Sequence, residues 1–183
     1  MPDHRFDLAS ALADYLRRHP TEAEACGLFS DFLASEGALF DRAHPPGHFT
    51  GSAWLVSADG ARVLLTHHRK LGRWLQLGGH ADGDPDLAQV ALREAGEESG
   101  LVDLQVDADI FDIDRHVIPA RGSEPEHWHY DVRFVVRASG SEEFAVSDES
   151  LALAWKPVLG IAGQPASDQS LRRMARKWLR PGR

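Results

Sequence analysis

The sequence lacks the features that mark several classes of protein. It contains a single cysteine, Cys26, so no disulfide can form within the chain, as is usual in a reducing compartment. No run of residues reaches the ~18–20 apolar residues that span a bilayer. The first residues show no basic segment followed by an apolar one, so no signal peptide is predicted. We therefore expect a soluble, cytoplasmic protein that does not bind membranes.

Basic residues are also scarce. The chain has 20 Lys and Arg against 28 Asp and Glu, a net charge of −8. Proteins that bind nucleic acid polymers or anionic membranes depend on clustered Lys and Arg, so neither partner is expected. A small anionic substrate is still compatible with this charge, because a bound metal ion reverses the local field. The length of 183 residues suits one soluble globular domain.

Two helical segments are predicted at the start of the chain. Apolar residues recur at helical spacing from Leu8 to Leu16, and Pro20 follows them. Thr21 and Glu24 have the spacing of a capping box, which predicts a second helix that ends near Gly37. We predict that residues 1–47 form an N-terminal helical extension. It is expected to pack on the same domain or to contribute to a homodimer interface.

Residues 48–183 are predicted to form the main domain. Strand-like patterns cover residues 49–56, 63–65, 73–77, 105–116, 127–136 and 152–156, and helical patterns cover residues 86–99 and a segment from about residue 167. Strands and helices interleave irregularly, which predicts an α/β or α+β fold with a mixed sheet.

The most informative segment is the predicted helix over residues 86–99. Glu94, Glu97 and Glu98 are three and four residues apart and so share one face. Carboxylates this close repel one another unless a cation lies among them, and Mg²⁺ or Mn²⁺ prefers such oxygen ligands. A solvated acidic helix face is the alternative. Arg93 lies one turn before Glu97 and is expected to orient that carboxylate by hydrogen bonds.

Glycines precede this helix. Gly78 and Gly79 are expected at a turn between a strand and the helix, where the missing Cβ lets the backbone approach a metal or phosphate closely. A backbone carbonyl at this turn, assigned to Gly79, is a candidate metal ligand.

Together these residues resemble the signature of the Nudix hydrolases, G-x5-E-x7-R-E-U-x-E-E-x-G-U, in which U is usually aliphatic. The matching positions are Gly79, Arg93, Glu94, Ala95, Glu97, Glu98, Gly100 and Leu101. One position departs from the signature, because Pro85 replaces its first glutamate. Asp84, one residue earlier, is the candidate substitute.

The resemblance implies a fold and a reaction. The fold is an α/β/α sandwich around a mixed sheet, and the reaction is metal-dependent hydrolysis of a nucleoside diphosphate linked to another moiety. Glu94, Glu97 and Glu98 are implied as metal ligands, and Glu97 and Glu98 as catalytic residues, with Glu98 a candidate base. Some members supply the base from a distant loop, and Glu149 is the candidate there; a turn residue without a catalytic role is the alternative for Glu149.

Candidate substrate contacts lie on the predicted strand over residues 127–136. Alternation places His127, His129, Asp131 and Arg133 on one side of it. Arg133 is expected to bind phosphate, and the histidines phosphate or metal. The alternative is a solvated face with a local pair between Asp131 and Arg133. His80 follows the glycines and is expected to reach the phosphates or to be an idle loop residue.

Two other functions are compatible with the same fold. One is a non-catalytic nucleotide-binding or regulatory module, against which stands the complete set of glutamates in the signature. The other is an isomerase of isoprenyl diphosphates, which is expected to need a cysteine in the cleft. Cys26 belongs to the helical extension and is poorly placed for that role. The sequence does not identify the nucleotide derivative.

Overall fold

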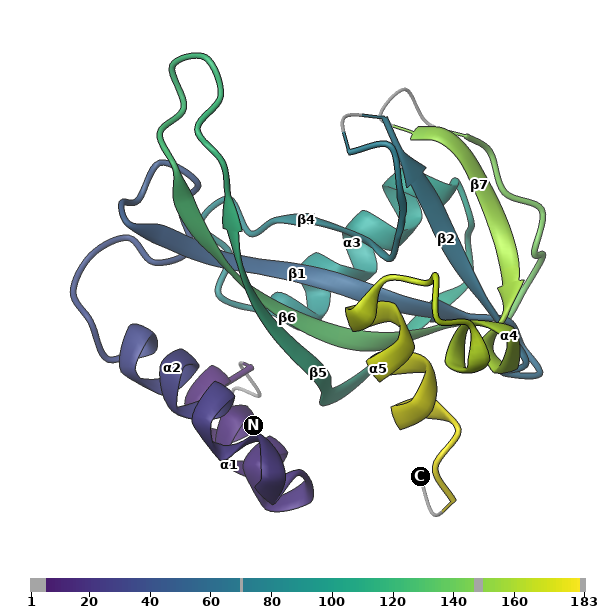
Figure 1. The fold of residues 1–183 in the computed structure, drawn as a ribbon, viewed down its shortest axis with the longest axis horizontal. Coiled ribbons are helices and arrows are strands. Elements are labelled where there is room, and N and C mark those ends of the chain that lie inside the picture. Colours follow the sequence, from purple (N-terminus) through teal and green to yellow (C-terminus); the bar gives the residue numbers. More distant parts are fainter. Residues whose placement is uncertain (1–5, 70, 147–149, 182–183) are drawn as a thin grey trace.

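The computed structural model describes residues 6–69, 71–146 and 150–181 (Figure 1). The helices are α1 (Leu8–Arg18), α2 (Ala23–Leu33), α3 (Leu87–Ser99), α4 (Val158–Gly163) and α5 (Gln169–Trp178), with a 3-10 turn at Pro20–Glu22. The strands are β1 (Gly47–Val56), β2 (Arg62–His68), β3 (Trp74–Leu75), β4 (Leu77–His80), β5 (Leu104–Ile118), β6 (His127–Ala138) and β7 (Ser150–Pro157).

The strands form one mixed sheet in the order β3-β2-β1-β6-β5, with β4 also paired to β1 and β7 to β2. β1 and β6 run parallel, and their register aligns His48 with His129. The other pairs are antiparallel. The predicted class, an α/β fold with a mixed sheet flanked by helices, is confirmed.

The two faces of β1 pack against different helices, because successive side chains point to opposite sides of a strand. On one face α3 lies close, since a Cβ added to Gly51 would meet the Leu87 carbonyl oxygen at 2.9 Å. On the other face Trp54 and Val56 share a buried core with Met174 of α5. In Figure 1, α3 lies behind the sheet and α5 in front of it. We call the second side the α5 face.

The N-terminal helices pack on the sheet through aromatic side chains. Phe32 of α2 stacks on Tyr130 of β6 with a centroid distance of 4.0 Å, and Phe29 meets the same ring edge-on at 5.4 Å. Lys177 of α5 donates to the Tyr15 hydroxyl at 2.7 Å, which ties α1 to the C-terminal helix. No helix in the described part of the chain is long and apolar enough to cross a membrane.

Helix boundaries agree with the sequence at α3 and differ at α2. Asp86 caps α3 by accepting from the Gln89 amide at 3.1 Å, and Gly100 ends it with φ of 69°. At α2 the predicted capping box is wrong. Thr21 lies within the 3-10 turn, and α2 begins at Ala23 without a side-chain cap.

Candidate functional site

Two glutamates of α3 lie against the backbone of β4. The Gly78 amide donates to Oε1 of Glu98 at 2.7 Å. A Cβ added to Gly79 would lie 2.6 Å from Cδ of Glu94, so this carboxylate occupies the space that a side chain would need. Glu97, on the same helix, is exposed. The predicted turn at Gly78 and Gly79 is wrong, because both residues belong to β4, but the close approach of the backbone is present.

Arg93 of α3 connects the β4 backbone with a glutamate of its own helix. Its Nη2 donates to the His80 carbonyl at 3.1 Å and to Oε1 of Glu94 at 3.3 Å. Arg93 was expected to orient Glu97. Instead its guanidinium turns toward β4 and contacts Glu94 and the His80 carbonyl. Its Nη1 lies 4.0 Å from Oδ2 of Asp84. Asp84 thus offers Arg93 a carboxylate from the loop in which Pro85 interrupts the signature.

The residues at this position suit a hard divalent cation. Glu94 and Glu98 bring carboxylate oxygens to the backbone of β4, and Gly79 leaves room for them where any larger residue would collide. An all-oxygen donor set is the one that Mg²⁺ and Mn²⁺ select. The close contact between Gly79 and the Glu94 carboxylate is therefore the observation that supports a divalent cation at this position.

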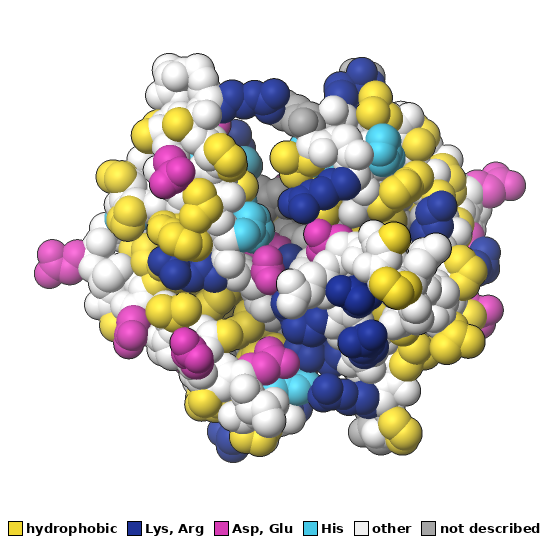
Figure 2. Space-filling model, in the orientation of Figure 1, with side chains coloured by type: hydrophobic (Ala, Val, Ile, Leu, Met, Phe, Trp, Pro, Cys, Tyr) yellow, Lys and Arg dark blue, Asp and Glu magenta, His cyan; other side chains and the backbone are white. Residues whose placement is uncertain are grey.

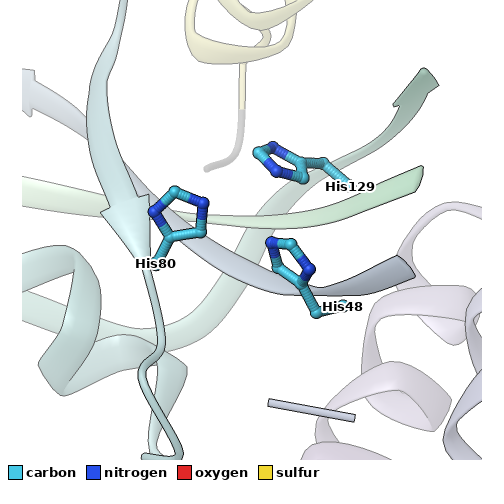
Figure 3. Close-up of side chains that lie close together, drawn as sticks. All are labelled: His48, His80 and His129. Carbon is cyan, nitrogen blue, oxygen red and sulfur yellow. The ribbon is translucent and has the colours of Figure 1, made fainter. Parts of the chain in front are cut away.

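Histidines gather on the α5 face, beside β4. Ring nitrogens of His48 (β1), His80 (β4) and His129 (β6) lie within 4.8 Å of one another, and Figure 3 shows the three rings converging from their strands. His127 adds a fourth ring, with its Nε2 3.2 Å from Nε2 of His129. We call His48, His80, His127 and His129 the histidine cluster. Strand register assembles it, because Thr50 pairs with His80 and His48 with His129.

The imidazoles of His48, His80 and His129 are held in their neutral form. Burial, reinforced by neighbouring histidines, lowers the pKa of His48 to about 4 and that of His129 to about 2. Burial, followed by the charge of Arg42, also lowers the pKa of His80. His48 is fully buried, and neither of its ring nitrogens has a hydrogen-bond partner among the described residues. Neutral rings of this kind can donate lone pairs to a metal ion.

Arg133 does not fit the expected role in phosphate binding. It is 2% exposed, and its Nε donates to Asp131 at 2.8 Å while Nη1 donates to Asp112 at 3.2 Å. Burial lowers the pKa of Arg133, but the Asp131 and Asp112 carboxylates outweigh it and hold the pKa above its usual value. The pair between Asp131 and Arg133 exists, yet in the core and not on a solvated face. A guanidinium enclosed in this way cannot contact a substrate phosphate.

Glu149 lies outside the described residues. His48 did not enter the prediction as a site residue, although His48, Thr50 and Ser52 alternate as polar residues within an otherwise apolar strand. That alternation is the signal that could have identified it. Cys26 is buried in α2, 3.5 Å from the Leu12 carbonyl of α1.

A cavity of about 640 Å³ lies at the β2 end of the α5 face. Residues from the neighbouring strands and helices line it, among them Leu65, His67, Trp74, Lys156, Ile161 and Leu171. The Lys156 ammonium lies 4.6 Å from the Trp74 ring centroid. Figure 2 shows the molecule hollowed between two lobes, with histidine and basic side chains along the hollow. The face therefore offers space together with an aromatic ring and a cation.

The fold is similar to that of known proteins. Residues 48–178 match the family model described as NUDIX domain. The Ap4A hydrolase of C. elegans, solved as a binary complex, is 18% identical over 71% of this chain and 93% of its own, with a TM-score of 0.56. The dihydroneopterin triphosphate pyrophosphohydrolase of E. coli is 17% identical over 70% and 92%, with a TM-score of 0.55.

A third solved structure is the NUDIX domain of Shewanella oneidensis NrtR, complexed with ADP ribose. It is 20% identical over 82% of this chain and 98% of its own, with a TM-score of 0.51. Similarities at this level of identity concern the fold alone. A search of curated proteins finds no match. Because the family model spans well over half of the sequence, the chain belongs to the Nudix family.

Proposed function

We propose that the protein is a metal-dependent hydrolase that cleaves the pyrophosphate linkage of a nucleoside diphosphate joined to another moiety. The observation that carries this proposal is the position of Glu94 and Glu98 against the β4 backbone, with the Gly78 amide 2.7 Å from Oε1 of Glu98. Membership of the Nudix family supports the reaction class.

Glu94, Glu97, Glu98 and the Gly79 carbonyl are the proposed ligands of Mg²⁺ or Mn²⁺. When bound, such an ion neutralises charge on the phosphate oxygens and lowers the pKa of a bound water. Arg93 holds Glu94 by the 3.3 Å hydrogen bond and neutralises part of the negative charge of the helix face. The Gly78 amide fixes one oxygen of Glu98.

Glu98 is the proposed general base, with Glu97 as its catalytic neighbour. A carboxylate with one oxygen fixed by a backbone amide is oriented before substrate arrives, so it can accept the proton of the attacking water without reorganisation. Glu149 stays the alternative base.

The substrate is proposed to extend across β4, with part of its pyrophosphate at the α3 glutamates and the remainder on the α5 face. His80, His127 and His129 present ring nitrogens there and would meet its phosphates directly or through a metal ion. The cavity beside Trp74 offers an aromatic surface for a base or for the second moiety. Two of the structurally similar proteins are an Ap4A hydrolase and a domain complexed with ADP ribose, which favours nucleotide-like substrates.

The test is product release from a panel of nucleotides by the full chain in the presence of Mg²⁺. The panel contains ADP-ribose, Ap4A, nucleotide sugars and nucleoside triphosphates, and products are separated by ion-exchange chromatography. We expect hydrolysis of at least one member, and we expect Glu98→Gln to lower kcat by about 10²–10⁴-fold, the usual contribution of a general base. Glu24→Gln, on the exposed surface of α2, is the matched control and should retain full activity.

Two results would contradict the proposal. One is a wild-type protein whose rate across the panel equals that of Glu98→Gln. The other is tight nucleotide binding without product release, which would favour the non-catalytic binding module. Equal activity of Glu98→Gln and Glu24→Gln would instead assign the base to another residue.

A further inference from the structure

The histidine cluster has a donor chemistry different from that of the α3 glutamates. Its ligand atoms are imidazole nitrogens, which suit Zn²⁺ and similar transition metals, whereas Mg²⁺ selects oxygens. Ring nitrogens of His48, His80 and His129 already lie within 4.8 Å of one another. Around a tetrahedral zinc ion, with Zn–N distances of about 2.0–2.1 Å, they would be about 3.4 Å apart. The ring nitrogens would therefore have to approach one another by at most about 1.4 Å to hold the ion.

His48 gives independent support for a ligand in the histidine cluster. Its side chain is fully buried, yet both ring nitrogens lack a hydrogen-bond partner among the described residues. Buried polar groups in folded proteins are almost always partnered, and an exception calls for an explanation such as an ion. The His48 ring faces the rings of His80 and His129, with centroid distances of 5.2 and 4.7 Å (Figure 3). A metal ion among the three rings would give a partner to one of these two nitrogens.

The hydrogen bonds of His127 orient its ring as a metal ligand is usually oriented. Its Nδ1 lies 2.9 Å from the Pro125 carbonyl oxygen, which can only accept, so Nδ1 carries the proton. In the neutral ring the lone pair is then on Nε2, which lies 3.2 Å from Nε2 of His129. A backbone carbonyl that fixes the tautomer in this way is a common partner of metal-binding histidines.

The cluster is distinct from the site of the α3 glutamates. Neighbouring residues of a strand point to opposite faces. At Gly79 the α3 side of β4 is filled by Glu94, and the next side chain, His80, turns toward the α5 face. Arg93 belongs to the glutamate side, because its Nη2 donates to Glu94 and to the backbone carbonyl of His80 and not to the His80 ring.

We propose that His48, His80 and His129 bind a divalent transition metal ion of the Zn²⁺ type, with Nε2 of His127 as a fourth donor. This site is additional to the oxygen site of the α3 glutamates and does not depend on the hydrolase activity. Three imidazoles fixed by strands and a fourth fixed by a backbone carbonyl form a nitrogen site that Mg²⁺ would not occupy.

The test is a titration of the metal-free full chain with Co²⁺, a spectroscopic substitute for Zn²⁺, in excess Mg²⁺. We expect one equivalent to bind, with a visible absorption band that Zn²⁺ abolishes by displacement. His48→Asn and His80→Asn should each weaken binding by more than about 100-fold, beyond the 10–100-fold loss that follows removal of an outer-shell partner. His67→Asn is the matched control, because His67 contacts Trp74 and no ring of the cluster, and it should bind Co²⁺ normally.

Further measurements keep the result interpretable. Glu97→Gln should leave Co²⁺ binding unchanged, which separates this proposal from the proposed hydrolase site. His80 is only partly buried, so His80→Asn decides the question if circular dichroism shows that His48→Asn is unfolded. X-ray absorption at the cobalt edge of the wild type reports nitrogen or oxygen donors without any substitution. A wild type that binds no Co²⁺, full binding by His80→Asn, or an all-oxygen donor set would overturn the proposal.

Discussion

The polar side of β6 has two halves, whose side chains differ in the kind of partner that they contact. At one end His127 and His129 face other histidines, so that nitrogen meets nitrogen. At the other end Asp131 and Arg133 face partners of opposite charge. Both halves follow the same strand alternation and lie on the same face of the sheet. Their difference therefore comes from the neighbouring elements and not from the strand itself.

The Asp131 end is complete within the protein. Asp131 accepts hydrogen bonds from Thr50 at 2.9 Å, from Ser52 at 2.7 Å and from Arg133 at 2.8 Å. Asp112, which is fully buried, accepts from Arg133 and also from Lys177, at 2.8 Å. These contacts join β1, β5, β6 and α5. Their role is accordingly to hold the elements together.

The histidine end is incomplete without a ligand. His48 is as buried as Asp112, yet its nitrogens find no partner in the described part of the chain. A buried polar residue thus indicates function when its neighbours leave it without hydrogen-bond partners, and structure when they supply those partners. Both kinds of residue lie on the α5 face here.

The largest expected effect on stability comes from breaking the complete end. Arg133→Met leaves the buried carboxylates of Asp112 and Asp131 with fewer partners, and removing one member of a buried ion pair usually costs about 3–5 kcal/mol. Urea denaturation of the full chain measures this loss. Arg17→Met, at the exposed pair with Asp14, is the control and should change stability little. Equal losses in the two variants would mean that the buried pairs do not hold the fold together.

A smaller effect should follow from acid. Burial raises the pKa of Asp112, but the Arg173 hydrogen bond and the charges of Arg133 and Lys177 outweigh it and hold the pKa below its usual value. A carboxyl with a depressed folded-state pKa stabilises the fold above its unfolded pKa of about 3.9, and this stability is lost as the pH falls further. Thermal unfolding should show a loss below about pH 4, with a shallower loss in Arg173→Met. A loss of the same size in Arg173→Met would show that the Asp112 carboxyl does not cause the acid sensitivity.

The smallest effect, and the one with opposite sign, is expected at the histidine end. In metal-free protein His48→Leu removes two buried nitrogens without partners and fills a similar volume with apolar atoms. We expect the free energy of unfolding to rise by about 1 kcal/mol, since an unsatisfied buried group costs about 1–3 kcal/mol. Urea denaturation in EDTA makes the comparison with Arg133→Met direct. A loss as large as that of Arg133→Met would make His48 a structural residue and end the contrast between the two halves.

The sequence predicted those parts of the site that depend on local spacing. Helix α3, its cap at Gly100 and the shared face of Glu94 and Glu98 follow from residues close together in the chain. The parallel register of β1 and β6 does not, because it joins His48 to His129 across a long connection. The buried position of Arg133 could not be predicted from the local sequence pattern either. Alternation gave its side of the strand, but Asp112 on β5 decided that the guanidinium is enclosed.

The most direct test of the contrast between the two halves is a crystal structure of the full chain grown with both Zn²⁺ and Mg²⁺, with anomalous scattering measured at the zinc edge. We expect a zinc peak among the ring nitrogens of His48, His80 and His129 and no ion beside Arg133. An absence of zinc at the histidines, with the peak at Glu94 and Glu98 alone, would contradict it.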